Sequence, residues 1–315
     1  MFIPYDNAIP KHAAKFVRIV RGVATHISAD TNEVSYHAIG SNDKESEATS
    51  KLKFDYLVLA TGSSYSVPIK PDSRDHARSA TELKLQEVRG HIEKAERILV
   101  VGGGAVGCEV AAEVMAKYPN KSVTIVDANK QLIAGNNLRD KSTHRLTGNC
   151  FETRTLRTDK GTEITSDIQL LCGGFSPVST LVQEMNLSLV TDRGFVKVND
   201  KLQLEDTKYA HVFALGDMCN HPTPKMAIWA GEQASFLAGE LTAVIREKQT
   251  GFINPFAGVA VEAMILPLGP SGGVSQLPMF GGIVLRDWFT RLIKSRDYLA
   301  GRIWASIGAS VPINN

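Results

Sequence analysis

A glycine pattern with the spacing of a dinucleotide-binding turn lies in the middle of the chain. Residues 98–113 read ILVVGGGAVGCEVAAE, an apolar run that leads into Gly102-x-Gly104-x-x-Gly107 and then into a helical sequence. In such a turn the first glycine permits the tight bend, the second lets the backbone approach a pyrophosphate, and the third lets the helix pack against the strand. The helix N-terminus then offers N–H groups and a partial positive charge to the phosphates. The pattern therefore favours binding of a dinucleotide.

A carboxylate stands where this turn needs one for a ribose. Asp127 ends the apolar run VTIVD and follows Gly107 by 20 residues. A carboxylate at this place accepts a hydrogen bond from a ribose 2′-hydroxyl and repels a 2′-phosphate, which favours NAD(H) over NADP(H). The alternative is a tight strand-to-helix turn without a ligand, because the glycine pattern alone is weak evidence.

These residues require a β-α-β unit to position them. We expect its strand at 98–102, its helix at 105–118 and its second strand at 123–128. Three other apolar runs end in small residues, which are ATG at 60–62, CGG at 172–174 and GD at 216–217. Ligands of α/β proteins bind where the carboxyl ends of parallel strands meet. We therefore expect these endings to line a binding edge.

The rest of the chain predicts a mixed α/β fold. Apolar alternation over 16–39 indicates a hairpin or meander, and the polar residues 40–50 indicate an exposed loop. The runs at 54–62 and 164–174 each resemble a strand buried on both faces. Helical spacing of apolar residues predicts helices at 80–94, 225–247 and 286–304, and residues 256–285 resemble short strands.

Composition narrows the class of function. Of the 315 residues, 43% are hydrophobic and 22% are charged, and the net charge is +2, which is too low to favour nucleic acid as a partner. No apolar run approaches the length of a membrane span. The cysteines, which are Cys108, Cys150, Cys172 and Cys219, form no close pair. This spacing indicates reduced thiols in a cytoplasmic protein rather than disulfide chemistry.

Taken together, the motifs resemble those of the two-dinucleotide flavoprotein oxidoreductases, a family that includes glutathione reductase, type II NADH dehydrogenases and apoptosis-inducing-factor-like proteins. The resemblance is strongest to the apoptosis-inducing factor 2-like branch, also called ferroptosis suppressor proteins. The segments that carry it are FDYLVLATGSSYSVP (54–68), ILVVGGGAVGCEVAAEV (98–114), TDKGTEI (158–164), HVFALGD (211–217), TPKMAIWAG (223–231) and IKSRDYL (293–299).

The resemblance implies two cofactor sites. The internal fingerprint, with Asp127, Gly173 and Gly174, would bind NAD(P)H. Four residues would belong to the FAD site, and these are Thr61, Gly62, Gly216 and Asp217.

The resemblance also implies two catalytic residues. Lys225 would lie near the flavin ring, and Glu109 between nicotinamide and flavin. A Glu–Lys pair there would hold its two charges in place, and the cation would stabilise negative charge on reduced flavin. The alternatives are a solvated first-turn carboxylate for Glu109 and a surface cation for Lys225.

The implied reaction is hydride transfer from NAD(P)H to FAD, followed by electron transfer to a quinone-type acceptor. The implied fold is α/β, with two Rossmann-like domains, the first truncated at its N-terminus, and a small C-terminal α+β region. We expect residues 1–69 and 179–250 to form the incomplete FAD domain, 70–178 the inserted NAD(P)H domain and 251–315 the C-terminal region. The oligomeric state is left open.

The expected location is cytoplasmic, with a peripheral contact to membranes such as the lipid-droplet or mitochondrial surface seen in relatives. Residues 286–304, aromatic and basic, would make this contact, although a helix packed on the domain explains them equally well.

Two departures from the family pattern suggest an alternative function. Residues 1–53 hold only Gly22 and Gly40, so they lack a first glycine fingerprint, and the stretch between Asp127 and Gly161 is short. The alternative is a truncated, flavin-deficient protein that binds NAD(H) without catalysis.

Overall fold

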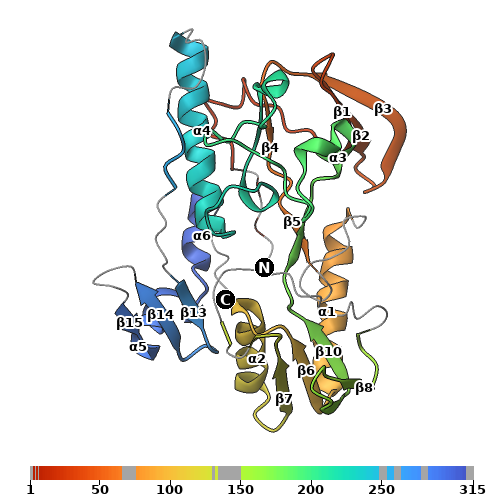
Figure 1. Cartoon of the computed structure of the whole chain (residues 1–315), viewed down its shortest axis with the longest axis vertical. Helices are drawn as coiled ribbons and strands as arrows, with labels where there is room; N and C mark the ends of the chain where they lie inside the picture. The colour runs from red at the N-terminus through yellow and green to blue at the C-terminus, as the bar shows by residue number, and fades with distance from the viewer. Residues whose placement is uncertain are drawn as a thin grey trace. The chain divides into compact units, whose positions relative to one another are not determined.

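The computed structural model describes residues 3, 5, 7–65, 76–129, 132–133, 150–247, 254–258, 264–277 and 283–309. The chain divides into two compact units (Figure 1). The first unit comprises Met1–Val20, Glu82–Gly173 and Val261–Asn315, and the second comprises Arg21–Thr81 and Gly174–Ala260. The domain limits expected at 69–70 and 250–251 lie outside the described residues, and the limit at 178 stays a prediction.

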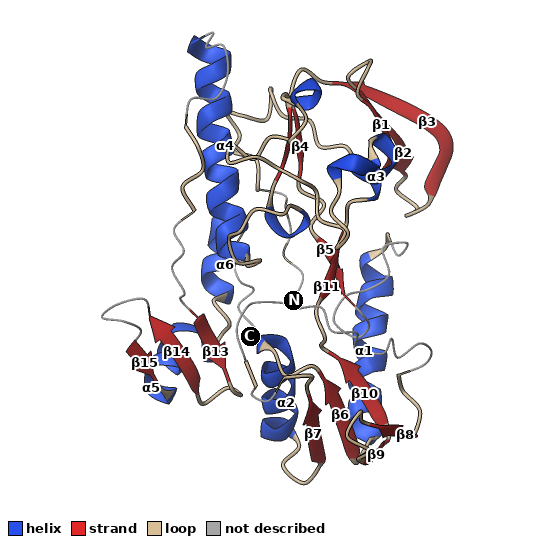
Figure 2. Ribbon diagram, viewed as in Figure 1, coloured by secondary structure: helices blue, strands red, loops and turns tan. Residues whose placement is uncertain are grey.

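A three-stranded parallel sheet with the order β10-β6-β7 organises the first unit. β6 (Arg97–Val101) lies between β7 (Ser122–Val126) and β10 (Ile168–Leu171), as Figure 2 shows. Ile98, Leu99 and Val100 of β6 are each at most 1% exposed, as is Leu170 of β10. A central parallel strand needs such an unbroken apolar run because neighbours cover both of its faces.

Two helices frame this sheet. α1 (Arg78–Lys94) leads into β6, and α2 (Ala105–Lys117) connects β6 to β7 and packs against both. The predicted β-α-β unit is therefore confirmed. The predicted strand at 164–174 is instead divided: β9 (Glu163–Ser166) forms a hairpin with β8 (Arg154–Arg157), and only β10 joins the parallel sheet.

The C-terminal part of the first unit has a small antiparallel sheet and short helices. β13 (Met264–Pro267), β14 (Gly273–Leu277) and β15 (Ile283–Leu285) pair in chain order, as the sequence predicted. The single helix predicted at 286–304 is wrong. The segment contains α5 (Asp287–Thr290), a π-helix (Arg291–Ser295) and α6 (Ala300–Ser306). The left-handed backbone of Tyr298 and Leu299 interrupts it.

A meander of β1 (Gly22–Ser28), β2 (Glu33–Ile39) and β3 (Glu45–Lys53) opens the second unit. The loop predicted at 40–50 is wrong for its second half, because residues 45–50 belong to β3. β3 is an edge strand whose side chains are mostly exposed, so its backbone pairs with β2 while its polar side chains face solvent. The polar side chains of β3 are the reason that the sequence predicted a loop there.

Two short strand pairs bring distant segments of the second unit together. β4 (Leu57–Leu59) runs parallel to β12 (Val212–Ala214), and β5 (Ser63–Tyr65) pairs with β11 (Phe175–Pro177). The parallel partner of β4 was expected, but burial on both faces was not borne out, since Val58 is 40% exposed. The helices of this unit are α3 (Thr180–Met185) and α4 (Ala227–Glu247).

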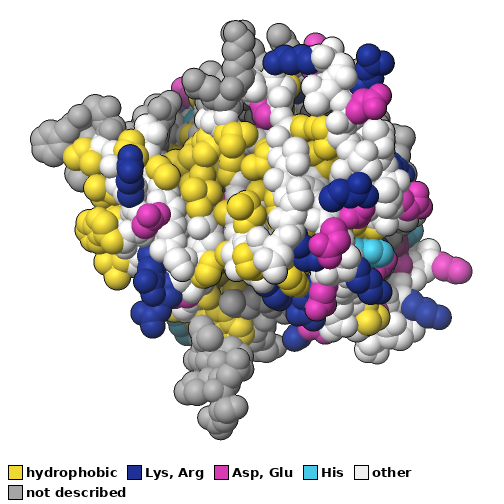
Figure 3. Space-filling model, turned by 90° about the horizontal axis from the view of Figure 1, so that it is seen from below, with side chains coloured by type: hydrophobic (Ala, Val, Ile, Leu, Met, Phe, Trp, Pro, Cys, Tyr) yellow, Lys and Arg dark blue, Asp and Glu magenta, His cyan; other side chains and the backbone are white. Residues whose placement is uncertain are grey.

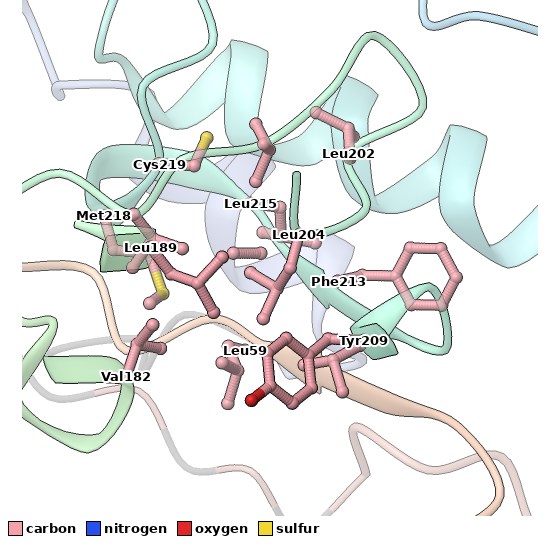
Figure 4. Packing of buried hydrophobic residues seen from close by; sticks show 14 of the residues in the cluster. Leu59, Val182, Leu189, Leu202, Leu204, Tyr209, Phe213, Leu215, Met218 and Cys219 are labelled. Carbon is pink, nitrogen blue, oxygen red and sulfur yellow. The ribbon is translucent and has the colours of Figure 1, made fainter. Parts of the chain in front are cut away.

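One hydrophobic cluster forms the core of the second unit. Figure 4 shows Leu59, Val182, Leu189, Phe213 and Met218 among its members. They come from β4, α3, β12 and the loops between them, so the cluster holds the ends of β4 and β12 in one place.

The surface carries charges of both signs. On the face drawn in Figure 3, lysine and arginine side chains lie among aspartate and glutamate side chains, in keeping with the net charge of +2. Among the helices of the described segments, none has the length and apolar character that a membrane crossing requires.

Asp167 connects β6 and β10 at their start, and it carries a pH-dependent part of the stability. Its carboxylate accepts hydrogen bonds from Arg97 Nη2 at 2.6 Å and from the backbone N–H groups of Arg97 at 2.8 Å and Glu96 at 3.0 Å. The Arg97 side chain first, and these N–H groups next, lower the pKa of Asp167 from 3.8 to about 2. A carboxylate with a lowered pKa stabilises the fold above its ordinary pKa, and this stability is lost as the pH falls through the lowered one.

We expect Asp167→Asn to reduce the free energy of unfolding at neutral pH by about 1–2 kcal/mol, discounted for partial solvent screening. The difference from the parent chain should shrink as the pH falls from 3.8 toward about 2. Urea unfolding across this pH range measures it, with the exposed Asp159→Asn as the matched control. A difference that stays constant with pH would contradict the assignment.

Candidate functional site

The fingerprint turn has the geometry that the glycine spacing predicts. Gly102 has a φ of 108°, and a Cβ there would lie 2.5 Å from the carbonyl oxygen of Cys172. A Cβ on Gly107 would overlap the carbonyl oxygen of Gly102. Among the described residues, no atom lies within 4 Å of the position that a Cβ on Gly104 would take, and Gly104 is the N-cap of α2. The first and third glycines therefore serve packing, whereas the second leaves an open cradle at a helix N-terminus.

Asp127 does more than the sequence indicated. Its Oδ2 accepts a hydrogen bond from the backbone N–H of Gly103 at 2.6 Å, and its Oδ1 accepts one from Asn129 N at 2.7 Å. The carboxylate thus lies directly beside the glycine turn. It stabilises the shape of the turn and remains near the place expected for a ribose. Asp127 therefore stabilises the turn and is also the residue expected to bind a ribose.

Gly173 and Gly174 follow β10 at the limit between the units. Gly173 lies beside the fingerprint turn, because its backbone nitrogen is 2.8 Å from the Cβ position of Gly102. Gly174 has a φ of 114° and begins the second unit. The structure therefore brings Gly173 to the candidate NAD(P)H site, as expected from the end of a parallel strand.

Glu109 has an ion-pair partner that the sequence interpretation missed. Lys294 Nζ lies 3.1 Å from Glu109 Oε1, and it also donates a hydrogen bond to the carbonyl oxygen of Ile265 at 3.1 Å. The signal was present in the KSRD segment, which carried the resemblance but no assigned role. Lys225 belongs to the second unit, so a Glu109–Lys225 pair stays a prediction.

The expected FAD residues of the second unit meet at the ends of β4 and β12. Ser63 Oγ donates a hydrogen bond to Asp217 Oδ2 at 2.8 Å. Thr61 Oγ1 donates to the carbonyl oxygen of Val178 at 2.5 Å, and Gly62 O accepts from Val178 N at 2.9 Å. Parallel pairing of the two strands explains why segments so far apart in sequence share one edge.

Lys225 is a half-buried cation in the same unit. Its Nζ donates a hydrogen bond to the carbonyl oxygen of His221 at 2.6 Å. Burial lowers the pKa of Lys225, and burial together with Lys225 lowers the pKa of His221. Among the described ion pairs, none joins Lys225 to a carboxylate. A desolvated ammonium of this kind favours an anionic ligand.

Gln233 is a buried residue beside the expected FAD residues that sequence reasoning did not identify. Its buried side chain accepts a hydrogen bond from Gly216 N at 2.7 Å and donates one to Thr223 Oγ1 at 2.9 Å. It therefore joins the GD turn to the TPKMA segment that carries Lys225. A small hollow beside it is lined by Gly216, Thr223, Pro224, Lys225, Met226, Trp229, Ala230 and Gln233.

Comparisons with known proteins give the site a context. A family profile described as "Pyridine nucleotide-disulphide oxidoreductase" matches residues 7–234. Ferroptosis suppressor protein 1 of Xenopus tropicalis is 31% identical over 293 residues, which cover 84% of this chain and 75% of that protein. A FAD-dependent oxidoreductase of Flammulina velutipes is 28% identical over 276 residues, which cover 82% of this chain and 84% of that protein.

A solved structure shows the same fold at lower identity. NDH2 from Plasmodium falciparum, in complex with NADH, has a TM-score of 0.62 and 13% identity, with 86% of this chain and 78% of that chain covered.

Two variants can test whether Gly107 serves packing and Gly104 serves binding. Gly107→Ala should destabilise the chain by about 3 kcal/mol, because a Cβ there overlaps backbone. Gly104→Ala should change stability by less than about 0.5 kcal/mol but weaken NADH binding about tenfold or more, since its methyl group enters the open cradle. Thermal unfolding and NADH fluorescence titration measure the two effects. Unchanged NADH affinity in Gly104→Ala would remove this turn from the binding site.

Proposed function

Because the chain belongs to the pyridine nucleotide-disulphide oxidoreductase family, we propose that it oxidises NAD(P)H with FAD and passes the electrons to a quinone-type acceptor. One observation carries the proposal: each unit has a turn at the end of a parallel strand with a carboxylate beside it, Asp127 in the first and Asp217 in the second. Two such turns match a chemistry with two dinucleotides. A relative is named as FAD-dependent, and a structural neighbour is described in complex with NADH.

The first unit supplies the groups for NAD(P)H. The N-terminus of α2 offers its N–H groups to the pyrophosphate across the open space at Gly104. Asp127 accepts hydrogen bonds from ribose hydroxyls and repels a 2′-phosphate, so NADH is the preferred donor. Glu109, in the second turn of the same helix, would lie beside the nicotinamide, and Lys294 holds its carboxylate.

The second unit supplies the groups for FAD. Asp217, oriented by Ser63, binds the ribityl and phosphate side, and Thr61 and Gly62 line the same edge. Lys225 offers an ammonium without a carboxylate partner among the described residues, which suits the negative charge of a reduced flavin. Bound FAD would supply the two-electron step between the hydride donor and the acceptor.

A small-molecule acceptor fits the cysteines better than a disulfide does. All four cysteines are buried. Burial raises the pKa of each of them, so they stay protonated and poorly nucleophilic. We therefore propose a quinone-type acceptor.

The second candidate function is NAD(H) binding without stable flavin. Residues 1–53 contain two glycines, Gly22 and Gly40, and this stretch does not itself form a glycine fingerprint. The two candidates predict different colours for the purified chain.

The purified chain, mixed with FAD and passed through a desalting column, should retain a flavin absorbance band at about 450 nm that bleaches with NADH. Ubiquinone should restore the band, which a disulfide substrate should not do. A colourless protein that still binds NADH would establish the second candidate instead.

A Lys225 variant tests whether this residue takes part in flavin reduction. Lys225→Met should retain most of the flavin but slow its reduction by NADH about tenfold, because the reduced ring loses its cation. The control is Lys208→Met, which removes an exposed lysine paired with Asp30 in the same unit. Equal rates in both variants would exclude a catalytic role for Lys225.

We also propose a cytoplasmic location. Residues 286–304 would make a peripheral contact with a membrane surface. Trp288 and Leu292 are 69% and 72% exposed, and Arg291 lies beside them. Aromatic and aliphatic side chains next to arginine suit the headgroup region of an anionic membrane. Binding to vesicles that contain phosphatidylserine should fall about tenfold or more in a Trp288→Ala/Leu292→Ala variant. Co-sedimentation measures it, and equal binding of both chains would contradict this contact.

A further inference from the structure

The C-terminal segment of the first unit contacts the fingerprint helix through two polar pairs. Lys294 Nζ lies 3.1 Å from Glu109 Oε1, and Tyr298 Oη donates a hydrogen bond to Glu113 Oε1 at 2.5 Å. Glu109 and Glu113 are one turn apart on α2. Lys294 and Tyr298 have the same spacing on their own segment. The two pairs are therefore successive contacts between α2 and the turn from Lys294 to Tyr298, rather than isolated surface contacts.

The backbone at Tyr298 departs from a helix at this point. Tyr298 and Leu299 have φ values of 52° and 59°, in the left-handed region that residues with a Cβ rarely adopt. Such strain persists only where surrounding contacts hold it. Tyr298 N donates to Lys294 O at 2.7 Å, so the turn closes directly on the lysine of the other pair. The geometry of Tyr298 is thus tied to the position of Lys294.

The hydroxyl of Tyr298 is a stable donor. Desolvation raises its pKa well above the ordinary value of a phenol, and the hydrogen bond to Glu113 raises it further. The phenol therefore keeps its proton at neutral and mildly alkaline pH.

Lys294 depends on its neighbours for its position. A lysine side chain has many rotamers, and holding one of them costs conformational entropy. Its Nζ is held by Glu109 and by the carbonyl oxygen of Ile265 in β13. The backbone that carries it is held on α2 by Tyr298. Loss of the Tyr298 hydroxyl removes this second attachment.

We propose that Tyr298 is a positioning residue that, through its hydrogen bond to Glu113, holds Lys294 against Glu109 and so orients the Glu109 carboxylate. The proposal rests on the proposed function for its kinetic consequence, because only there does Glu109 face the nicotinamide. Its structural consequence, the immobility of the Lys294 amine, does not need that function.

The first test measures the lysine directly. The rate at which acetic anhydride acetylates Lys294 is measured by mass spectrometry. It should be about threefold higher or more in Tyr298→Phe than in the chain with Tyr298, because the Lys294 amine spends more time unpaired. The exposed Lys160 serves as the internal reference, and Tyr118→Phe as the matched loss of a hydroxyl at the end of α2. An unchanged Lys294 rate would overturn the proposal whether or not the chain is an enzyme.

The second test measures flavin reduction by NADH in a double-mutant cycle. Tyr298→Phe should slow reduction at saturating NADH about fivefold, change NADH affinity by less than about twofold, and have no further effect in a Glu109→Gln background. An equal slowing in both backgrounds would show a merely structural role and overturn the proposal. If the unmodified chain is not reduced at all, the proposed function fails, and the acetylation rates decide the role of Tyr298.

Discussion

The backbone of β6 and the first turn of α2 approach each other so closely that no side chain fits between them. A Cβ on Gly107 would overlap the Gly102 carbonyl oxygen, and one on Gly102 would press on the backbone of Cys172. This contact places the N-terminus of α2 at the carboxyl edge of the sheet. The turn is further held by Asp127 through the N–H of Gly103. The candidate NAD(P)H site follows from that approach, because its N–H groups and its carboxylate converge only when the contact is made.

The second unit builds a comparable edge with side-chain hydrogen bonds. Ser63 holds Asp217, and the buried Gln233 joins Gly216 to Thr223. A buried amide that satisfies one donor and one acceptor is costly to leave unpaired, so it specifies the position of both segments. These bonds keep the GD turn next to the segment that carries Lys225.

Lys294 in the first unit and Lys225 in the second unit have opposite electrostatic environments. Lys294 has the carboxylate of Glu109 at 3.1 Å. Lys225 is half-buried and bonded to the neutral carbonyl oxygen of His221, and burial lowers its pKa. The sequence interpretation paired Glu109 with Lys225, because a cation and a carboxylate near one cofactor suggest a pair. Within the first unit Glu109 binds Lys294, which is 185 residues away along the chain and lies in the KSRD segment. A Glu109–Lys225 pair stays a prediction.

By itself, the sequence determined the β-α-β unit, the glycine turn and Asp127, because these depend on short spacings and on the steric difference between glycine and other residues. It also grouped the ATG, CGG and GD endings as the ends of parallel strands. ATG and GD do follow the paired strands β4 and β12, whereas CGG follows β10 in the sheet of the first unit. It did not reveal β3, whose polar side chains face solvent, or the break in 286–304, where Tyr298 and Leu299 take a left-handed backbone. Only the tertiary structure decided these features, together with the roles of Gln233 and Lys294, because hydrogen bonds between distant segments depend on three-dimensional packing and leave no periodic signal in the chain.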